Sequence, residues 1–375
     1  MAKDTKDRLM QSALELFSSQ WYETASIADI CRKAGLSNGV FYRYFKNKEK
    51  IFSELLDRFL ERFSGEMSDI QGNTLEERLE CFIKVLISAG TSYRQWVTLF
   101  REGQYRFPEY EKQLRELFLR SLKLVFRRDV SESEYLFIVS GLRFISTRSL
   151  YENQEFSYET IKQIILNGVF SDTLSDGLFI PAPAVEFSIE ETPESRRKLL
   201  MTGISLFGSK GFHKVGIYEI VHTAGYAVGT FYTHFSSKKL FLEEIIIFIG
   251  KTVRHYITEH LSHGINRLDR EIQGYWLFVQ LFIRHPEFYQ IVREAEFVVK
   301  KSVSDYYNKF QNGYVRNLRD TPFLHNGEQG ILTVSNYLIG IAHYLGIEVL
   351  FSKNVVQIED RLTEIAGYLA RGIVP

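Results

Sequence analysis

Apolar residues recur at helical spacing along nearly the whole chain. Near the start, one face of a helix is formed by six apolar residues: Leu9, Met10, Ala13, Leu14, Leu16 and Phe17. Steps of three and four residues between apolar positions are typical of an amphipathic helix, whereas alternation with period two, typical of a strand, is scarce in this sequence. The pattern therefore predicts an all-α fold.

The chain contains one stretch twice. Residues 27–45 align without gaps with residues 217–235, so the offset in residue number is constant at 190. Further along, the similarity weakens and the offset changes to 178, where Arg106–Tyr110 resembles Arg284–Phe288. Self-similarity of this kind indicates duplication of a whole structural unit, here of about 185 residues. We therefore expect two tandem units of the same architecture.

Three of the seven prolines, Pro181, Pro183 and Pro193, lie close together between the two copies. Proline cannot continue a helix, and a Pro-Ala-Pro segment favours an extended backbone. We therefore divide the chain into a first helix-turn-helix domain (1–50), a first helical core (51–175), a linker (176–194), a second helix-turn-helix domain (195–240) and a second helical core (241–375).

Each repeated stretch has the signals of a helix-turn-helix. Ser26 and Asp29 have the spacing of a capping box that begins the second helix, and Gly216 with Glu219 is its weaker counterpart. Gly35 and Gly225 then end that helix, because glycine readily adopts the left-handed conformation of a C-cap. Two short helices joined by such a tight turn fit the geometry that enters a DNA major groove.

The third helix of the first copy is expected over 37–45, with Ser37 as its cap. Phe41 and Phe45 face inward, and Gly39 allows close approach of the helix to another surface. The residues expected at DNA are Ser37, Asn38, Gly39, Val40, Tyr42, Arg43, Tyr44 and Lys48. Asn38 suits an adenine edge, the Val40 methyl groups suit a thymine methyl, and the tyrosine hydroxyls and Lys48 suit phosphates.

The second copy presents a different surface to DNA. Its expected contacts are Val228, Gly229, Thr230, Tyr232, His234 and Lys238. Val228 replaces Asn38, Thr233 replaces Arg43 and His234 replaces Tyr44. Ala227 lacks the capping hydroxyl of Ser37, and Gly203 places a poor helix former at the Ala13 position. We expect two different half-sites, with the second copy as the weaker binder or a copy that has lost DNA binding.

Charge is distributed unevenly although the formal net charge is zero. Residues 1–50 contain nine Lys and Arg against six Asp and Glu, and residues 191–240 contain seven against three. Basic segments within an otherwise acidic chain are typical of proteins in which small surfaces meet phosphate. This asymmetry supports nucleic acid as the partner of both repeated stretches.

Composition narrows the class of protein further. Only Cys31 and Cys81 are present, which excludes a disulfide framework and favours a reducing compartment. The charged N-terminus and the lack of a membrane-like apolar run lead us to expect a soluble, cytoplasmic protein without a membrane partner.

No common catalytic motif, such as a P-loop or G-x-S-x-G, is present, so we expect no enzyme, no catalytic residues and no cofactor. His255, His260 and His263 with Glu259 are the only concentration of histidine. They offer too few ligands on one helix face, so we expect no metal site.

The run from Gly35 to Lys48 resembles the TetR family of bacterial transcriptional regulators, in the pattern G-x-x-x-G-x-[FL]-Y-x-[YH]-F-x-[NS]-K. Gly225 to Lys238 fills the same pattern. The resemblance implies a sequence-specific DNA-binding regulator, and of the two directions of regulation we favour repression. It also implies that a helical core for effector binding and dimerisation follows each DNA-binding domain. Family members pair to read two half-sites, and this chain carries both halves itself, so the resemblance implies a monomeric pseudo-dimer on an asymmetric double-stranded DNA operator.

The resemblance also implies a four-helix bundle within one polypeptide, from 131–153 with 158–170 and 330–351 with 357–371. It implies an apolar pocket for a small effector in each core. The aromatic residues on the corresponding stretches are Tyr93, Trp96, Phe100 and Tyr105, and Tyr275, Trp276, Phe278, Phe282, Tyr306 and Tyr337. Most aromatic residues on helices of this kind pack in the hydrophobic core and do not line a pocket. The alternative function is a ligand-sensing or protein-interaction protein in which one or both DNA-binding domains are inactive.

Overall fold

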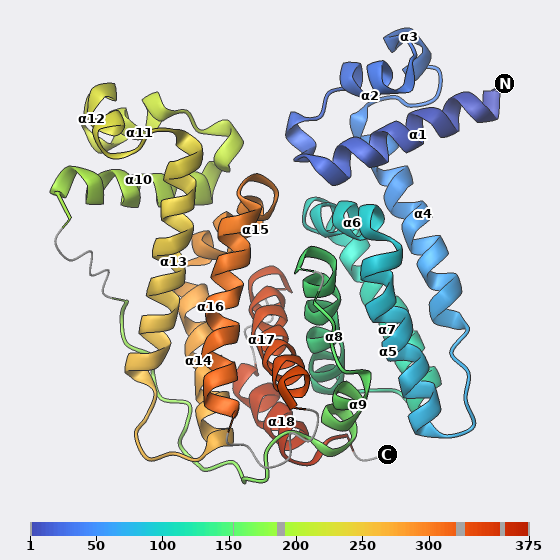
Figure 1. Cartoon of the computed structure of the whole chain (residues 1–375), viewed down its shortest axis with the longest axis vertical. Coiled ribbons are helices and arrows are strands. Elements are labelled where there is room, and N and C mark those ends of the chain that lie inside the picture. Colours follow the sequence, from blue (N-terminus) through green and yellow to red (C-terminus); the bar gives the residue numbers. More distant parts are fainter. Residues whose placement is uncertain (1, 153, 186–191, 320–326, 353–356, 374–375) are drawn as a thin grey trace. The chain divides into compact units, whose positions relative to one another are not determined.

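The computed structural model describes residues 2–152, 154–185, 192–319, 327–352 and 357–373 (Figure 1). Every regular element in these ranges is helical, so the predicted all-α class is confirmed. The first copy contains α1 (Ala2–Ser19), the 3₁₀ turn η1 (Tyr22–Thr24), α2 (Ile27–Ala34), α3 (Asn38–Phe41), α4 (Lys48–Ser68), α5 (Leu75–Ser92), α6 (Arg94–Arg106), α7 (Pro108–Phe126), α8 (Glu132–Glu152) and α9 (Tyr158–Asn167).

The second copy repeats this order of elements. It contains α10 (Glu194–Lys210), the 3₁₀ turn η2 (Phe212–Lys214), α11 (Ile217–Ala224), α12 (Val228–His234), α13 (Lys238–His260), α14 (Arg267–Arg284), α15 (Pro286–Val298), α16 (Lys300–Leu318), α17 (Gly327–Ser352) and α18 (Ile358–Arg371). We refer to α1–α3 with η1 and the start of α4 as far as Ile51 as the first head, and to α10–α12 with η2 and the start of α13 as far as Phe241 as the second head.

Three consecutive helices of the two cores, α5–α7 and α14–α16, correspond at a single offset of 192. The starts of α5, α6 and α7 at Leu75, Arg94 and Pro108 match those of α14, α15 and α16 at Arg267, Pro286 and Lys300, and the paired helices have equal lengths of 18, 13 and 19 residues. The predicted offset of 178 is wrong. It aligned the start of α7 with the start of α15, because each of these helices begins with proline, a residue favoured at the first helical position.

The described chain forms two compact units, and the division between them runs within α8. One unit consists of Met1–Ser131 with Ile145–Tyr158, and the other consists of Glu132–Phe144 with Glu159–Val374. The second unit therefore combines the second copy with the first half of α8 and with α9. These are the helices that the sequence assigns to the bundle.

Helices α8 and α17 pack closely where glycines face the partner helix. A Cβ atom added to Gly141 would lie 2.5 Å from the Tyr337 ring, and one added to Gly340 would lie 2.7 Å from the Phe144 Cβ. The Tyr337 hydroxyl donates a hydrogen bond to the Phe137 carbonyl at 2.9 Å. Nearby, the Leu369 carbonyl of α18 accepts hydrogen bonds from Val169 and Phe170 N–H at 2.6 and 2.9 Å, just after α9. The expected bundle helices of the two copies thus contact one another within one polypeptide.

Helix α17 is the most apolar helix of this contact. Its stretch Gly327–Leu350 is the one described segment long and apolar enough to cross a membrane, and most of that stretch is buried inside the structure. Burial on several sides requires an apolar surface around the whole helix, as in the centre of a soluble bundle.

The segment between the two copies is extended and attached to the second core. Trp276 Nε1 donates to the Ile180 carbonyl at 2.7 Å, and the Tyr256 hydroxyl donates to the Pro183 carbonyl at 2.9 Å. The Ser175 hydroxyl donates to the buried Asp269 carboxylate at 2.7 Å. Side chains of the second core therefore satisfy backbone groups of the predicted linker, of which residues 186–191 lie outside the described ranges.

The glycine at position 203 has a steric explanation. A Cβ atom on Gly203 would overlap the ring of Phe241, which is fully buried. In the first head the two corresponding positions are Ala13 and Ile51. The second head thus combines a smaller residue on its first helix with a larger residue on α13, which keeps the total volume similar.

We predict that Gly203→Ala destabilises the second head by about 1–3 kcal/mol through overpacking, and that Gly203→Ala combined with Phe241→Ile restores most of the loss. Chemical denaturation followed by circular dichroism measures both. In the first head, Ala13→Gly serves as the matched control and should cost only about 1 kcal/mol of helix propensity. Strictly additive effects of the two changes at 203 and 241 would contradict the steric coupling.

Candidate nucleic-acid interface

The turn of each helix-turn-helix is built as the sequence predicts. Ser26 and Asp29 form a capping box, with the Asp29 N–H donating to Ser26 Oγ at 3.1 Å and the Ser26 N–H donating to Asp29 Oδ2 at 3.2 Å. Gly35 and Gly225 adopt φ values of 65° and 76°, in the left-handed region, at the C-caps of α2 and α11. Both turns can therefore be sharp without strain.

The third helix of each head differs from the expectation. Helix α3 covers only Asn38–Phe41 and continues as turns, whereas α12 covers seven residues. Ser37 occupies the N-cap position of α3 but makes no side-chain capping hydrogen bond. The predicted Ser37 cap is therefore wrong, and so is the predicted loss at Ala227, because no hydrogen bond of this kind exists to be lost.

The predicted burial of the phenylalanine and exposure of the tyrosine that follows it are confirmed in both heads. Phe41 and Phe231 are fully buried, while Tyr42 and Tyr232 expose 59% and 55% of their surface. Most other residues predicted to contact DNA are exposed or half-buried: Ser37, Asn38, Gly39, Val40, Arg43, Tyr44, Val228, Gly229 and Thr230. His234 is half-buried and its Nε2 lies 2.8 Å from the Ser195 hydroxyl of α10, so this ring is held within the head.

Lys48 and Lys238 lie in an unexpected environment. The Lys48 ammonium donates to the Tyr22 and Ala25 carbonyls, both at 2.8 Å, and lies 4.2 Å from the centre of the Tyr22 ring. Lys238 repeats this with the Phe212 and Val215 carbonyls at 3.0 and 2.9 Å. Burial lowers the pKa of both amines. Since an ammonium has three donors, one N–H of each remains for a phosphate.

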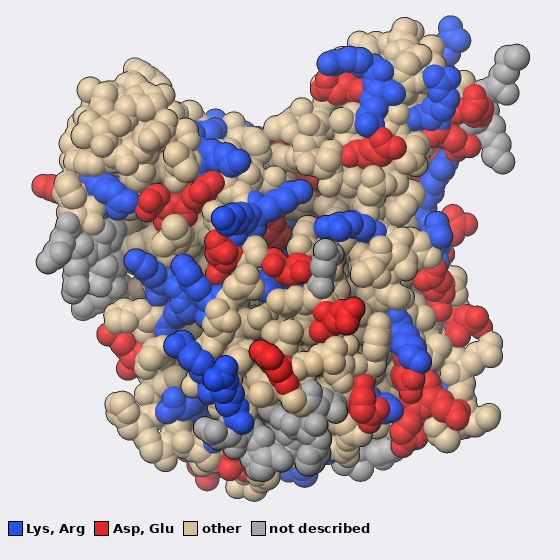
Figure 2. Space-filling model, viewed as in Figure 1, with Lys and Arg blue, Asp and Glu red and all other residues tan. Residues whose placement is uncertain are grey.

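The two heads differ in surface charge. In the sequence, Arg43, Lys46 and Lys50 of the first head correspond to Thr233, Ser236 and Leu240 of the second. Figure 2 shows Lys and Arg side chains over the region of α2 and α3, and a mostly uncharged surface over α11 and α12. The second head therefore offers fewer cations to a phosphate backbone.

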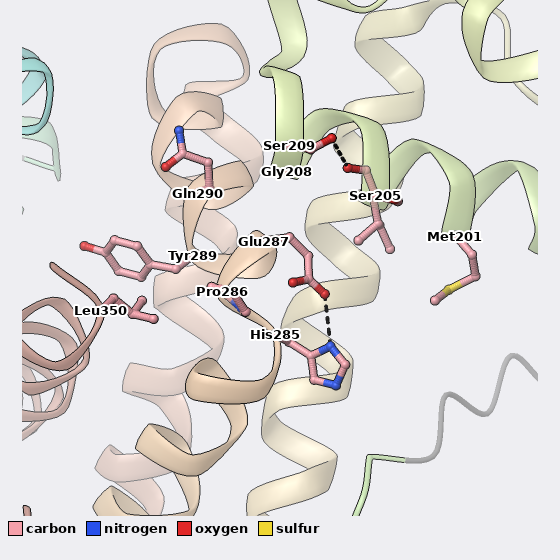
Figure 3. A pocket seen from close by; sticks show the side chains of 11 residues that line it. Met201, Ser205, Gly208, Ser209, His285, Pro286, Glu287, Tyr289, Gln290 and Leu350 are labelled. Carbon is pink, nitrogen blue, oxygen red and sulfur yellow. Dashed lines mark hydrogen bonds and ion pairs between the residues drawn. The ribbon is translucent and has the colours of Figure 1, made fainter. Parts of the chain in front are cut away.

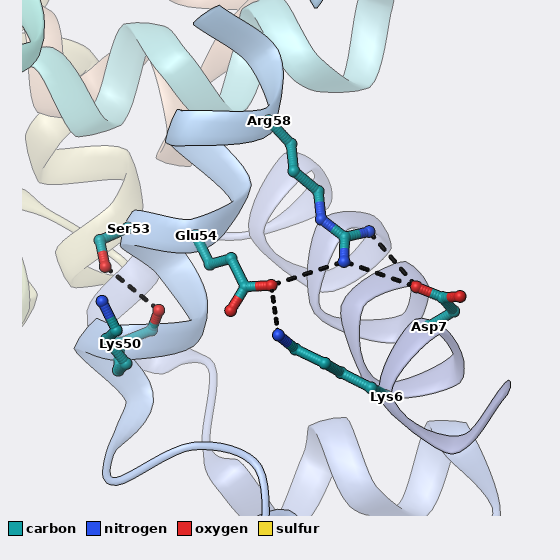
Figure 4. A network of polar contacts seen from close by, with 6 residues as sticks. All are labelled: Lys6, Asp7, Lys50, Ser53, Glu54 and Arg58. Atoms are coloured by element: carbon teal, nitrogen blue, oxygen red, sulfur yellow. Dashed lines mark hydrogen bonds and ion pairs between the residues drawn. The ribbon is translucent and has the colours of Figure 1, made fainter. Parts of the chain in front are cut away.

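The exposed side of α1 is attached to α4 by a network of charged side chains (Figure 4). Lys6 pairs with Glu54 at 2.7 Å, and Arg58 bridges Glu54 and Asp7 at 3.4 Å each. Exposed pairs of this kind contribute little individually, and networks contribute more.

Buried carboxylates connect each head to its core, and the sequence analysis missed them. Glu102 of α6 accepts a hydrogen bond from the Tyr22 N–H at 2.7 Å, and Glu294 of α15 accepts one from the Phe212 N–H at 2.7 Å. Both carboxylates are nearly inaccessible to solvent. A sequence signal existed: the pair Arg-Glu at 101–102 recurs at 293–294, in the register of the core helices.

The aromatic residues predicted to line an effector pocket make separate contacts where the structure describes them. Tyr93 bonds to Glu66 at the surface, Phe100 packs on Phe59, and Trp276 bonds to the linker. Tyr337 lies in the contact of α8 with α17, so it is a packing residue there. Tyr275, Phe282 and Tyr306 are buried, Trp96 is half-buried, and the side chain of Tyr105 lies outside the described part of the structure.

An open pocket of about 690 Å³ lies instead between α10 of the second head and α15 (Figure 3). Its lining is Met201, Ile204, Ser205, Gly208, Ser209, His285, Pro286, Glu287, Tyr289, Gln290 and Leu350, so it contains none of the predicted aromatic residues. Burial opposes ionisation of Glu287, but the hydrogen bond from His285 at 3.0 Å, a hydrogen bond from the Glu287 backbone N–H and the electrostatic attraction of His285 together lower the pKa of this carboxyl.

The histidines considered for a metal do not form a cluster. His255 pairs with Glu259 at 2.9 Å, and His260 Nδ1 lies 2.7 Å from the Tyr256 carbonyl. Among the described residues no group of three or more His, Cys, Asp or Glu side chains is placed to hold a metal ion.

The family described as "Bacterial regulatory proteins, tetR family" matches this chain twice, at residues 9–55 and 199–245. Among curated proteins, the chain is 32% identical over 99 residues to the HTH-type transcriptional regulator AcrR of Shigella flexneri, covering 25% of this chain and 46% of AcrR. It is 35% identical over 60 residues to the HTH-type transcriptional repressor ComR of Escherichia coli, covering 16% of this chain and 29% of ComR.

The chain thus spans less than half of the length of these curated relatives. Among solved structures, the fatty acid degradation regulator FadR from Bacillus halodurans aligns with 49% of this chain and 98% of its own, at 9% identity and a TM-score of 0.42.

We predict that Lys48→Met and Tyr42→Ala have different effects. Lys48→Met removes the lysine donor from two carbonyls, of which that of Tyr22 keeps the Ala25 N–H. The change should destabilise the first head by about 1–3 kcal/mol, seen as faster amide exchange around η1. Tyr42→Ala should change stability by less than about 0.5 kcal/mol and weaken binding to all duplexes. If Lys48→Met leaves amide exchange unchanged and lowers only the salt dependence of DNA binding, the lysine acts as a phosphate ligand alone.

Proposed function

The chain is a TetR-family protein that carries the family's DNA-binding domain twice, and we propose that it is a bacterial transcriptional regulator in which both heads read one DNA operator. The supporting observation is that each head combines a sharp left-handed turn with an exposed tyrosine at its third helix: Tyr42 directly after α3, and Tyr232 on α12. A second helix presented in this way is the element that enters the major groove in helix-turn-helix proteins.

The operator we propose is asymmetric. Asn38 offers an amide that pairs with adenine, and Arg43 offers a guanidinium for guanine or phosphate, whereas Val228 and Thr233 offer methyl groups and a hydroxyl at the same positions. The side chains at all four positions face solvent. Two unlike half-sites follow from these differences, with the first head contributing more of the phosphate contacts.

We also propose that one chain supplies both halves of the pseudo-dimer, so that the regulator acts as a monomer in the cytoplasm. The contacts of α8 and α9 with α17 and α18 support this, because they are made within one polypeptide. Control by a small apolar or aromatic effector is part of the proposal and is supported by the aromatic content of both cores. Repression is the proposed direction, as in the relative ComR, which is named a repressor.

A second candidate function is favoured by one observation on the second head. Ala28, Asn38 and Lys50 of the first head correspond to Tyr218, Val228 and Leu240. The three residues of the second head expose 71%, 40% and 46% of their surface. A surface that has become more apolar and less charged is typical of protein contacts. On this alternative the second head binds a protein, and only the first head reads DNA.

Selection of bound duplexes from a random library at about 100 mM salt, with the mass of the complex measured, tests the function. We expect one site with two unlike half-sites and one chain per duplex. Palindromic sites with two chains per duplex would mean that a single head of each chain reads DNA, and no enrichment would favour the sensing or interaction alternative.

Head-specific variants assign the half-sites. We predict that Arg43→Thr weakens binding about 5- to 100-fold, the value of one specific side-chain contact of about 1–3 kcal/mol, and alters preference in one half-site only. Thr233→Arg in the second head serves as the matched control and should strengthen binding and steepen its salt dependence. Equal effects of Arg43→Thr on every duplex would show that Arg43 contacts phosphate and carries no base preference.

A further inference from the structure

Each head contains a short 3₁₀ turn, between its first two helices, whose backbone groups are hydrogen-bonded by side chains from other helices. In the first head, the N–H of Tyr22 donates to Glu102 at 2.7 Å, and the carbonyl of Tyr22 accepts from Lys48 at 2.8 Å. Within the first turn, the Tyr22 carbonyl also accepts a hydrogen bond from the Ala25 N–H at 3.2 Å, whereas the Tyr22 N–H finds its acceptor in the Glu102 side chain. The carboxylate comes from the core helix α6, and the ammonium comes from the start of α4. The turn is thus fixed from two sides.

The second copy repeats the arrangement with different residues in the turn. The N–H of Phe212 donates to Glu294 at 2.7 Å, and the Phe212 carbonyl accepts from Lys238 at 3.0 Å. Glu294 corresponds to Glu102 in the register of the core helices, and Lys238 corresponds to Lys48 in the register of the heads. Two copies that differ in most of their sequence have therefore kept the same pairing of a core carboxylate with a head amide.

Because the two carboxylates are buried, these hydrogen bonds form in only one orientation of each head. Glu102 and Glu294 expose 2% and 4% of their surface. Water cannot replace a buried acceptor, so the head amide is satisfied only when the turn lies at the carboxylate. A head that rotates away from α6 or α15 moves the N–H of its turn out of reach of this buried acceptor. The pairing therefore selects one orientation of the head on its core.

We propose that Glu102 and Glu294 are positioning residues for DNA reading, each fixing the orientation of one helix-turn-helix on its own core. The inference rests on the proposed DNA-binding function and assigns residues outside the matched DNA-binding domains to it. A single residue separates the turn from the residue that caps the next helix, Ser26 in the first head and Gly216 in the second. A shift of the turn therefore moves α2 and α3, or α11 and α12, directly.

The two copies reinforce the pairing differently. In the first head, Arg106 pairs with Glu23 at 2.8 Å and lies 4.3 Å from the centre of the Tyr22 ring. The position that corresponds to Arg106 in the second core is Val298, so the second head lacks this ion pair. Instead, the His213 N–H donates to Glu294 at 3.4 Å. The second head consequently depends more on its carboxylate than the first.

Three substitutions at each glutamate separate the acceptor from the charge. Glu→Gln keeps a carbonyl acceptor at the same reach, Glu→Asp keeps the charge but is one methylene shorter, and Glu→Leu removes the acceptor. We expect Glu102→Leu and Glu102→Asp to weaken binding to the selected duplex about 10-fold, the effect of one unsatisfied backbone donor. Glu102→Gln should restore most of the affinity. At Glu294 the losses should be larger.

The decisive measurement compares the intact duplex with duplexes in which one half-site is scrambled. If Glu102 positions the first head, Glu102→Leu loses its effect when the half-site of that head is scrambled, and Glu294→Leu keeps its effect. A general loss of folded protein would weaken binding to all duplexes equally and would overturn the proposal. Glu116→Gln, at an exposed position of α7, is the control and should leave all affinities unchanged.

Amide hydrogen exchange distinguishes failure of this inference from failure of the DNA-binding function. In the free protein, Glu102→Leu should speed exchange about 10-fold in the peptide that contains Tyr22, with no change in α17 and α18. If the wild-type chain selects no duplex, the DNA-binding function fails, and the exchange result alone decides whether the carboxylates fix the heads. Unchanged exchange at the turns in both Leu variants would overturn the positioning role.

Discussion

The hydrogen-bonding requirement of one short backbone turn determines how each head is attached. A 3₁₀ turn between two helices exposes donors and acceptors that the helices cannot pair, and in a buried position these groups must find side-chain partners. Glu102 and Lys48 provide them in the first copy, and Glu294 and Lys238 in the second. The same lysines end the DNA-binding motif, so two of their three donors are used inside the protein. The function proposed above therefore assigns base reading to exposed side chains such as Asn38 and Arg43.

Sequence differences between the two heads are of two kinds, depending on whether the residue is buried or exposed. Inside the heads, the change from Ala13 to Gly203 is accompanied by the change from Ile51 to Phe241, because the two side chains of each pair occupy the same space. At the surface, the change from Asn38 to Val228 needs no such partner, since both residues face solvent. Differences between the exposed residues of the two heads therefore report on what each head binds, whereas differences between the buried residues report mainly on packing.

The contact of α8 with α17 shows why duplication within one chain matters. In a dimer of identical subunits, each residue of the contact is present on both sides of a twofold axis. Here the two sides have been free to differ: Tyr337 fits against Gly141 and donates to the Phe137 carbonyl from one side only. The same freedom allowed the heads to acquire unlike recognition residues. Both the asymmetric contact and the unlike heads are possible because the two copies belong to one chain and can change independently.

The sequence by itself determined the helical class, the duplication and the left-handed turns at Gly35 and Gly225, because these depend on local spacing and on residues with special backbone preferences. The ranges of the bundle helices followed from the resemblance to the TetR family. Tertiary structure alone decided which core helices correspond between the copies, since core helices diverge wherever any apolar residue of suitable volume will pack. It also decided the tasks of Lys48, Glu102 and Tyr337. Each of these side chains bonds to a backbone carbonyl or N–H, and a backbone group is the same at every residue, so no sequence pattern identifies the partner.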